Sequence, residues 1–222
     1  CPHSSSHDVM ASDTLPQRFP IFPLRGALLL PGGNLPLNIF EPRYLQMTRD
    51  AMQTDKVIGM IQPREGTGGE DGPAVYRTGC AGRITSFEET QDGRYLITLT
   101  GVSRFEVVEE LVTVTPYRQI VAAFDRFGSD LNPTPADVAR RGPLMQAMRS
   151  YFDRQRIEID WNAVDQAPFD GLVTSLAMIC PFTPSEKQAL LEADDQNARL
   201  DTLIALMRMH SFAADEGPSV RH

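Results

Sequence analysis

Lysine is scarce in this chain of 222 residues. Only Lys56 and Lys187 occur among its 21 lysines and arginines. Neither follows a glycine in a Gly-x-x-x-x-Gly-Lys-Ser/Thr loop, so the sequence excludes a nucleotide-binding loop of that type. Lys187 comes two residues after Ser185, at the start of an expected helix, where positions i and i+2 do not face each other. We therefore expect no Ser–Lys catalytic dyad.

Histidine and cysteine are also few, and they are badly placed for chemistry. The four histidines lie in or near the ends of the chain, and the three cysteines are far apart in sequence. This distribution argues against a histidine-dependent triad, a metal site or a disulfide framework in the folded core. We predict that Cys80 and Cys180 are small buried core residues. We also predict no catalytic residues, no cofactor and no metal, because an uncharacterised hydrolase would need a titratable cluster that is not visible.

Long apolar runs and an excess of positive charge are absent as well. No apolar stretch approaches the roughly 18–20 residues that span a bilayer, and the first residues do not resemble a signal peptide. We therefore expect a cytoplasmic protein with no membrane contact. The net charge of −8 makes a nucleic-acid partner unlikely, since phosphate binding depends on clustered positive charge. The only dense basic stretch is a set of five arginines that could also form a solvated helix face: Arg140, Arg141, Arg149, Arg154 and Arg156.

Residues 18–128 carry mainly β signals, with one helix. Short strands are expected over 19–24, 27–30, 57–61, 102–108 and 119–124. The clearest prediction is a hairpin of 82–90 and 94–100 around Asp92-Gly93, a pair that suits a turn with positive φ. A helix is predicted to begin at Pro42, because proline fits the first helical position. Short strands with glycine and proline between them favour a small, twisted, barrel-like sheet.

The rest of the chain is predicted to be helical. Thr183 and Glu186 have the spacing of a capping box, and Asp194-Asp195 can cap the last helix. Gly142-Pro143 should kink or divide the first helix. The predicted organisation is a disordered tail at 1–17, a β lobe at 18–128, a linker at 129–134, a helical lobe at 135–211 and a disordered tail at 212–222.

The order of several motifs resembles the N-terminal substrate-binding domain of Lon proteases. The most informative segment runs from Phe22 to Tyr44 and contains Phe-Pro-Leu, Pro-Gly, Leu-Pro-Leu and Ile-Phe-Glu-Pro-Arg-Tyr. Similar family elements follow at 79–105, which ends in Gly-Val-Ser-Arg-Phe, and at 176–200, which ends in Arg-Leu. The resemblance implies an α+β fold in which a PUA-like small β-barrel lobe with one helix precedes a C-terminal α-helical bundle.

The resemblance also implies a function. In Lon, this domain helps to select unfolded or degron-bearing proteins for an ATPase ring, and the present sequence contains neither the ATPase nor the peptidase signature. We therefore expect a stand-alone, non-enzymatic module that binds unfolded or partner polypeptides and works with, or competes with, a separate Lon-type protease. A PUA-like RNA-binding protein is the alternative.

The opening motif supplies the candidate binding residues. Its glycines leave backbone open to another chain, and its apolar residues are predicted to be too many for one face of a short strand, so that some would line a groove. The alternative is that these apolar residues are simply core. The candidate peptide-binding residues are Pro31, Gly32, Gly33, Leu35, Leu37, Phe40 and Tyr44.

Overall fold

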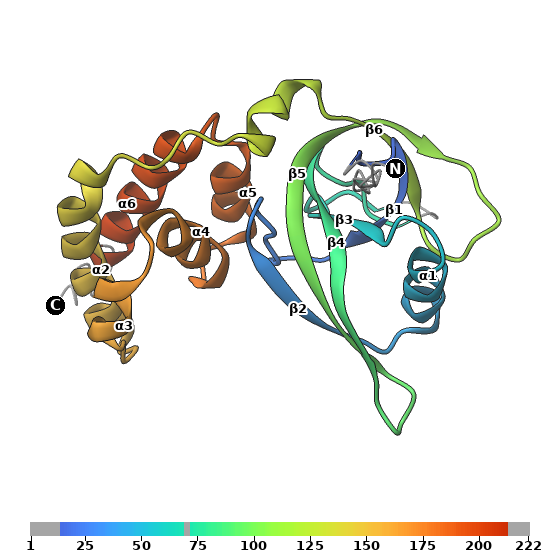
Figure 1. Cartoon of the computed structure of the whole chain (residues 1–222), viewed down its shortest axis with the longest axis horizontal. Helices are drawn as coiled ribbons and strands as arrows, with labels where there is room; N and C mark the ends of the chain where they lie inside the picture. The colour runs from blue at the N-terminus through green and yellow to red at the C-terminus, as the bar shows by residue number, and fades with distance from the viewer. Residues whose placement is uncertain (1–13, 69–71, 213–222) are drawn as a thin grey trace, which may run out of the picture.

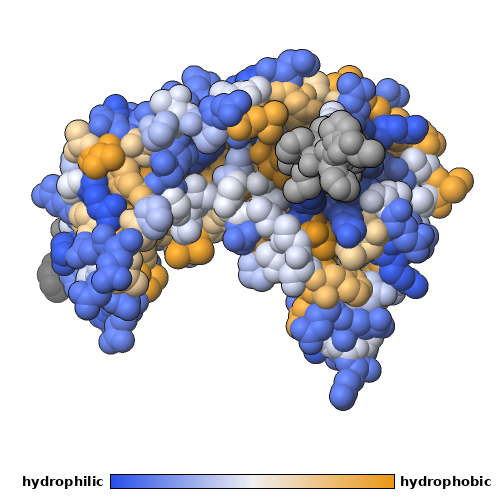
Figure 2. Space-filling view, viewed as in Figure 1, coloured by the Kyte–Doolittle hydropathy of each residue, from blue (hydrophilic) through white to orange (hydrophobic). Residues whose placement is uncertain are grey.

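The structure, a computed structural model, describes residues 14–68 and 72–212. A β lobe and a helical lobe form an arch with a deep notch between its two ends (Figures 1 and 2). Residues 1–13 of the predicted tail at 1–17, and residues 213–222 of the predicted tail at 212–222, lie outside the described residues. The β lobe contains β1 (Arg18–Pro23), β2 (Asn34–Ile39), α1 (Pro42–Met52), β3 (Val57–Ile61), β4 (Thr78–Glu89), β5 (Tyr95–Leu111) and β6 (Gln119–Ala123).

The six strands form one mixed sheet in the order β2-β5-β4-β3-β1-β6. Only β1 and β3 are parallel, and β6 also pairs with the second half of β5, so the sheet curls strongly. The sheet as a whole keeps a free edge at β2. It is therefore a curled mixed sheet and not the closed small barrel that the short strand signals suggested.

The β4–β5 hairpin confirms the predicted turn. Gly93 has a φ of 80°, and the N–H of Thr90 donates to the carbonyl of Arg94 at 2.9 Å. The prediction of a separate strand starting at Val102 is wrong, because β5 continues without a break through Gly101. Glycine is needed at 101 for close approach, since an added Cβ would collide with the Leu30 carbonyl.

Helix α1 begins as predicted, with Pro42 in its first turn after Glu41. Its buried face includes Tyr44, Met47 and Ala51. The strand expected at 27–30 does not form. The segment is irregular in backbone, yet Leu28, Leu29 and Leu30 are almost completely buried, which shows that apolar content there indicated core and not strand.

The helical lobe begins with two 3-10 segments. Its elements are η1 (Asp125–Leu131), η2 (Val138–Arg140), α2 (Arg141–Gln155), α3 (Trp161–Gln166), α4 (Phe169–Ile179), α5 (Pro184–Glu192) and α6 (Gln196–Phe212). Helices α2, α4 and α5 pack against α6. Pro143 lies in the first turn of α2 and not in a helix interior, so the chain divides at this point into η2 and α2. The capping box is confirmed, because Thr183 and Glu186 each accept a hydrogen bond from the other's backbone N–H.

The two lobes share one hydrophobic core. The main buried cluster contains Phe22 and Leu30 from the β lobe together with Leu190 and Leu203 from the helical lobe. The predicted N-terminal tail at 1–17 is wrong at its end, because Leu15 and Gln17 contact the β lobe. Leu15 packs against the second cluster of the β lobe, and the carbonyl of Gln17 accepts from Ala122 N–H at 2.8 Å.

Candidate functional site

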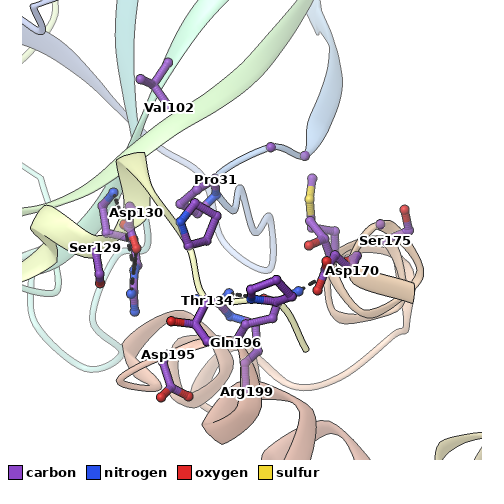
Figure 3. Close-up of a pocket in the computed structure, with 18 of the residues that line it drawn as sticks. Pro31, Val102, Ser129, Asp130, Thr134, Asp170, Ser175, Asp195, Gln196 and Arg199 are labelled. Carbon is purple, nitrogen blue, oxygen red and sulfur yellow. Dashed lines mark hydrogen bonds and ion pairs between the residues drawn. The ribbon is translucent and has the colours of Figure 1, made fainter. Parts of the chain in front are cut away.

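A cavity of about 480 Å³ lies between the lobes. Five separate stretches of chain form its walls: the turn that leads into β2, part of β5, the connection at 129–135, part of α4 and the start of α6 (Figure 3). The side chains on its walls mix apolar groups such as Pro31 and Met178 with charged groups such as Arg104 and Arg199. A cavity of this size and composition, placed between two lobes, is typical of a binding site.

The turn at Pro31–Gly33 presents open backbone to this cavity. Gly32 has a φ of 78°, a conformation that favours glycine. Gly32 N–H donates to Gly101 O at 2.9 Å, and Gly101 N–H donates to Gly33 O at 2.8 Å, which fixes the turn on β5. A Cβ at Gly33 would press on the sulfur of Met178. The glycines thus bring the turn close to α4 and leave it uncovered by side chains.

Arg104 connects the β lobe to the helical lobe at the back of the cavity. It projects from β5 and is only 1% exposed. Its guanidinium donates to both carboxylate oxygens of Asp130. It also donates to the carbonyls of Leu191 at 2.9 Å and Ala193 at 2.5 Å, which lie at the C-terminal end of α5. Because one buried side chain of the β lobe donates to acceptors on η1 and at the end of α5, it fixes the walls relative to each other.

Arg199 of α6 is a second buried arginine on the cavity wall, and it is 5% exposed. Its Nε donates to Leu190 O and its Nη1 to Gln196 Oε1, each at 2.9 Å. Its Nη2 is buried and has no hydrogen-bond partner anywhere in the described chain. Burial, and then the nearby Arg104, lower the pKa of Arg199 to about 10. The cavity wall therefore contains a charged donor that is incompletely satisfied.

Strand β2 extends from this cavity and has one free edge. The bond from Gly101 N–H to Gly33 O places Asn34 opposite Thr100 in a pair that exchanges no backbone bonds. Because hydrogen-bonded and non-hydrogen-bonded pairs alternate along an antiparallel ladder, the backbone groups of Leu35, Leu37 and Ile39 form hydrogen bonds with β5. The backbone groups of Asn34, Pro36 and Asn38 therefore point away from β5, toward the notch beside β2 in Figure 1.

The candidate residues from the opening motif are distributed along β2 and beyond it. Leu35 and Leu37 are half-buried and share a face with buried Ile39. Phe40, at the far end, is 63% exposed. Five strand steps separate Asn34 from Ile39, a distance of roughly 17 Å. Of the candidate residues, Pro31, Gly32 and Gly33 line the cavity.

Tyr44 lies apart from the other candidates, in the core of the β lobe. It is 7% exposed, and its ring centroid is 4.2 Å from that of Phe22. Burial, the largest influence, raises the pKa of Tyr44. A polypeptide bound at β2 would not touch this side chain, so Tyr44 supports the sheet and is not part of a binding surface.

Sequence reasoning did not select Arg104, Asp130 or Arg199. A signal was nevertheless present, because both arginines lie within segments that carried the family resemblance, at 101–105 and 199–200. Nothing in the sequence distinguished them from the solvated arginines. Only the contacts show that these two are buried.

The groups that could support catalysis are engaged elsewhere. Lys187 is buried and donates to Met178 O at 3.0 Å, while Ser185 lies 3.3 Å from the Thr183 hydroxyl. Burial raises the pKa of Cys180 to about 12, and it also raises that of Cys80. Both thiols are buried, as predicted. In the part of the chain that the structure describes, no three His, Cys, Asp or Glu side chains could together hold a metal ion.

Three of the five arginines considered for RNA binding have partners within the protein. Arg140 donates to Asp201, Arg141 donates to the carbonyls of Val164 and Asp165, and Arg149 lies over the ring of Trp161. They form no uniform basic surface. Over residues 14–68 and 72–212, no helix is long and apolar enough to cross a bilayer.

Comparison with known proteins identifies the family. The model of the ATP-dependent protease La (LON) substrate-binding domain matches residues 18–209. The chain belongs to this family. The assignment agrees with the geometry, because the matched residues include both lobes and every wall of the cavity.

Relatives of this LON domain include Lon protease 2 of Myxococcus xanthus, which is 28% identical over 88% of the chain. Lon protease of Methylocella silvestris is 28% identical over 84% of the chain. The chain spans about a quarter of the length of these two relatives, 24% and 23% respectively.

Two solved structures have the same fold. A Lon N-terminal domain protein from Xanthomonas campestris aligns with a TM-score of 0.58 and 25% identity, covering 85% of this chain and 97% of that one. The N-terminal domain of Mycobacterium avium complex Lon protease aligns with a TM-score of 0.61 and 14% identity, covering 87% of this chain and 99% of that one. The arrangement of sheet and helices is therefore that of the Lon N-terminal domain.

Proposed function

We propose that this LON domain is a non-enzymatic recognition module that binds unfolded or degron-bearing polypeptides and serves Lon-type proteolysis. The polypeptide lies in the notch between the lobes, along the free edge of β2, and its end or a side chain enters the interlobe cavity. The observation that carries the proposal is that this edge leads through the open Pro31–Gly33 turn directly into the cavity.

The edge of β2 offers few but well-placed backbone groups. Asn34 and Asn38 each present an N–H and a C=O, whereas Pro36 presents only a C=O. An extended polypeptide can add to such an edge through backbone hydrogen bonds, which require no particular sequence. Proline at the centre limits pairing with a second copy of the same edge. The edge therefore suits short, varied clients.

Apolar groups flank this edge and provide contact area. Leu35 and Leu37 are half-buried, Phe40 is exposed at one end, and Ile179 at the cavity rim is 69% exposed. Unfolded proteins expose apolar side chains that folded ones bury. Scattered apolar groups beside a hydrogen-bonding edge thus favour unfolded chains over folded ones. A separate Lon-type protease is the partner that would receive such clients.

Disordered β-casein is a suitable probe, with variants that change one backbone donor. Asn38→Pro removes an outward N–H without breaking the ladder to β5, and Asn38→Ala removes only the side chain. One backbone hydrogen bond is worth roughly 0.5–1.5 kcal/mol, so we expect Asn38→Pro to weaken binding by about two- to tenfold. Asn38→Ala should bind like the unmodified protein.

Photo-crosslinking tests the location independently. A photoreactive residue at exposed Asn34, beside the cavity, should capture β-casein. The same residue at Val114, which is fully exposed on the loop between β5 and β6 at the far side of the β lobe in Figure 1, should not. Equal capture at both positions, or equal binding by both Asn38 variants, would contradict the proposed groove.

A further inference from the structure

We propose that the interlobe cavity is a carboxylate subsite, in which Arg199 binds an acidic side chain or the C-terminal carboxylate of a polypeptide held at β2. The inference rests on the proposed function, because it specifies which chemical group enters the cavity at the end of that groove. It adds a selectivity that the apolar and backbone contacts do not provide.

The first argument is the hydrogen bonding of Arg199. Its Nε and Nη1 are held by Leu190 O and Gln196 Oε1, so the guanidinium plane is fixed before any ligand arrives. Its Nη2 remains unpaired within the described chain, which is costly for a buried charged group. Gln196 also donates to Asp170 O at 3.2 Å and so holds Arg199 from the side of α4 (Figure 3). A carboxylate oxygen is the strongest acceptor that a protein can offer to such a donor.

The second argument is the balance of buried charge. Two guanidiniums, Arg104 and Arg199, are buried at this cavity, whereas Asp130 is the one carboxylate of its lining that is buried. Both oxygens of Asp130 are engaged by Arg104 at 2.8 to 3.0 Å. The charge of Arg199 therefore has no buried counterpart of its own. A carboxylate that enters from solvent would supply it.

Two further carboxylates line the cavity, and neither fills this role. Asp170 and Asp195 are exposed at the rim, where water screens their charge far more than the interior would. Asp170 Oδ1 accepts from Ala136 N at 2.6 Å. Asp195 Oδ1 accepts from Ala198 N at 2.8 Å, and its side chain turns away from Arg199 in Figure 3. The acidic rim instead disfavours clients with several acidic residues in a row, so a single carboxylate is the expected ligand.

The remaining walls suit the aliphatic part of such a group. Pro31 and Met178 provide apolar surface near the entrance, and the hydroxyl groups of Thr134 and Ser175 add polar contacts. Asn34, where the edge of β2 begins, is itself part of the wall. An extended chain on β2 would therefore place its end, or the side chain of its terminal residues, in the cavity.

Four fluorescein-labelled peptides of alternating serine and valine test the subsite. Three are amidated and carry a penultimate glutamate, glutamine or leucine; the fourth carries glutamine and has a free C-terminal carboxylate. We expect the glutamate peptide to bind about tenfold more tightly than the glutamine peptide, the gain of one charge-assisted hydrogen bond. Comparing the fourth peptide with the glutamate peptide distinguishes a chain terminus from an acidic side chain.

Two protein variants establish where the carboxylate binds. Arg199→Gln should abolish the preference for glutamate. Because Arg199 also holds α5, Gly171→Phe provides a second variant that leaves this arginine in place: Gly171 lines the cavity, and a Cβ there meets nothing within 4 Å. The added ring should block the cavity and lower the affinity of the glutamate peptide at least tenfold. Gly142→Phe, at an equally open helical position outside the cavity lining, is the matched control.

The results of these binding experiments distinguish the carboxylate subsite from the polypeptide groove of the proposed function. If β-casein binds but both carboxylate peptides bind no better than the glutamine amide, the carboxylate subsite is refuted and the groove stands. The subsite is also refuted if Gly171→Phe and Gly142→Phe bind the glutamate peptide equally well. If neither β-casein nor any peptide binds, both proposals fail.

Discussion

Removing the Asp130 carboxylate should destabilise the whole domain, because it leaves Arg104 buried without its counterion. The ion pair is inaccessible, with side-chain exposures of 1% for Arg104 and 7% for Asp130. The carboxylate accepts from Arg104 Nη2 at 2.8 Å, from Nε at 3.0 Å and from the backbone N–H of the same residue at 2.9 Å. Asp130→Asn keeps the shape but turns an amide NH2 toward some of these donors.

The structure also sets the size of the expected loss in free energy of unfolding. Removing one partner of a buried ion pair costs about 3–5 kcal/mol. The carbonyls of Leu191 and Ala193 still accept from Arg104, so the lower end, about 3 kcal/mol, applies. With a urea dependence of about 2 kcal/mol per molar, the unfolding midpoint should fall by about 1.5 M.

Urea unfolding followed by circular dichroism measures this change. Asp92→Asn is the matched control, because Asp92 forms an ion pair with Arg94 on the exposed β4–β5 turn and its loss should leave the midpoint unchanged. The double variant Arg104→Met, Asp130→Leu should lose less free energy of unfolding than Arg104→Met and Asp130→Leu lose in sum. The reason is that the double variant leaves no unpaired charge. Additive losses, or a midpoint for Asp130→Asn equal to that of the control, would refute the role assigned to this pair.

Three further predictions concern local features. Gly101→Ala should lower the free energy of unfolding by about 3 kcal/mol, because its Cβ would collide with the Leu30 carbonyl and overpacking against backbone has no easy relief; thermal unfolding measures this. Thr183→Ala should cost about 1 kcal/mol in urea unfolding through loss of the N-cap of α5. Although burial acts in the opposite direction, hydrogen bonds from Thr183 and His210 hold the pKa of Glu186 below its usual range. Its stabilisation is therefore present above about pH 4.5 and is lost as pH falls through the lowered pKa, so Glu186→Gln should show a flatter fall in melting temperature below that pH.

The corresponding controls are simple. Gly128→Ala, where an added Cβ meets nothing within 4 Å, should not share the loss expected for Gly101→Ala. Thr183→Ser keeps a capping hydroxyl and should retain most of the stability. If the melting temperatures of Glu186→Gln and the unmodified protein fall in parallel between pH 4.5 and 3, the depressed pKa has no consequence for folding.

Local signals in the sequence predicted local structure well. The capping box at Thr183 and Glu186, the helix start at Pro42 and the turn at Asp92-Gly93 all formed, because each depends on interactions within about four residues. The same signals failed where distant contacts decided the outcome. Gly101 was predicted to separate two strands, but it allows β5 to run past the Leu30 carbonyl. The apolar segment at 27–30 was predicted to be a strand, but it has an irregular backbone and is buried in the core.

The candidate site was only partly predictable for the same reason. The opening motif drew attention to the Pro31–Gly33 turn and to β2, since a glycine-rich turn beside apolar residues is visible in one stretch of sequence. It could not show that Tyr44 faces the core, because that depends on packing against Phe22. Nor could it show that β2 lies at the edge of the sheet, since strand order is a property of the whole fold.

By itself, the sequence determined the family and the α+β content, because these follow from motif order and from which residue types are present. Only the tertiary structure decided that Arg104 and Arg199 are buried while other arginines are solvated. The cavity walls come from residues 31–34, 102–104, 129–135 and 170–199, and folding alone brings these segments together. The two arginines matter because their guanidinium groups are removed from water, and this happens only when the lobes pack together.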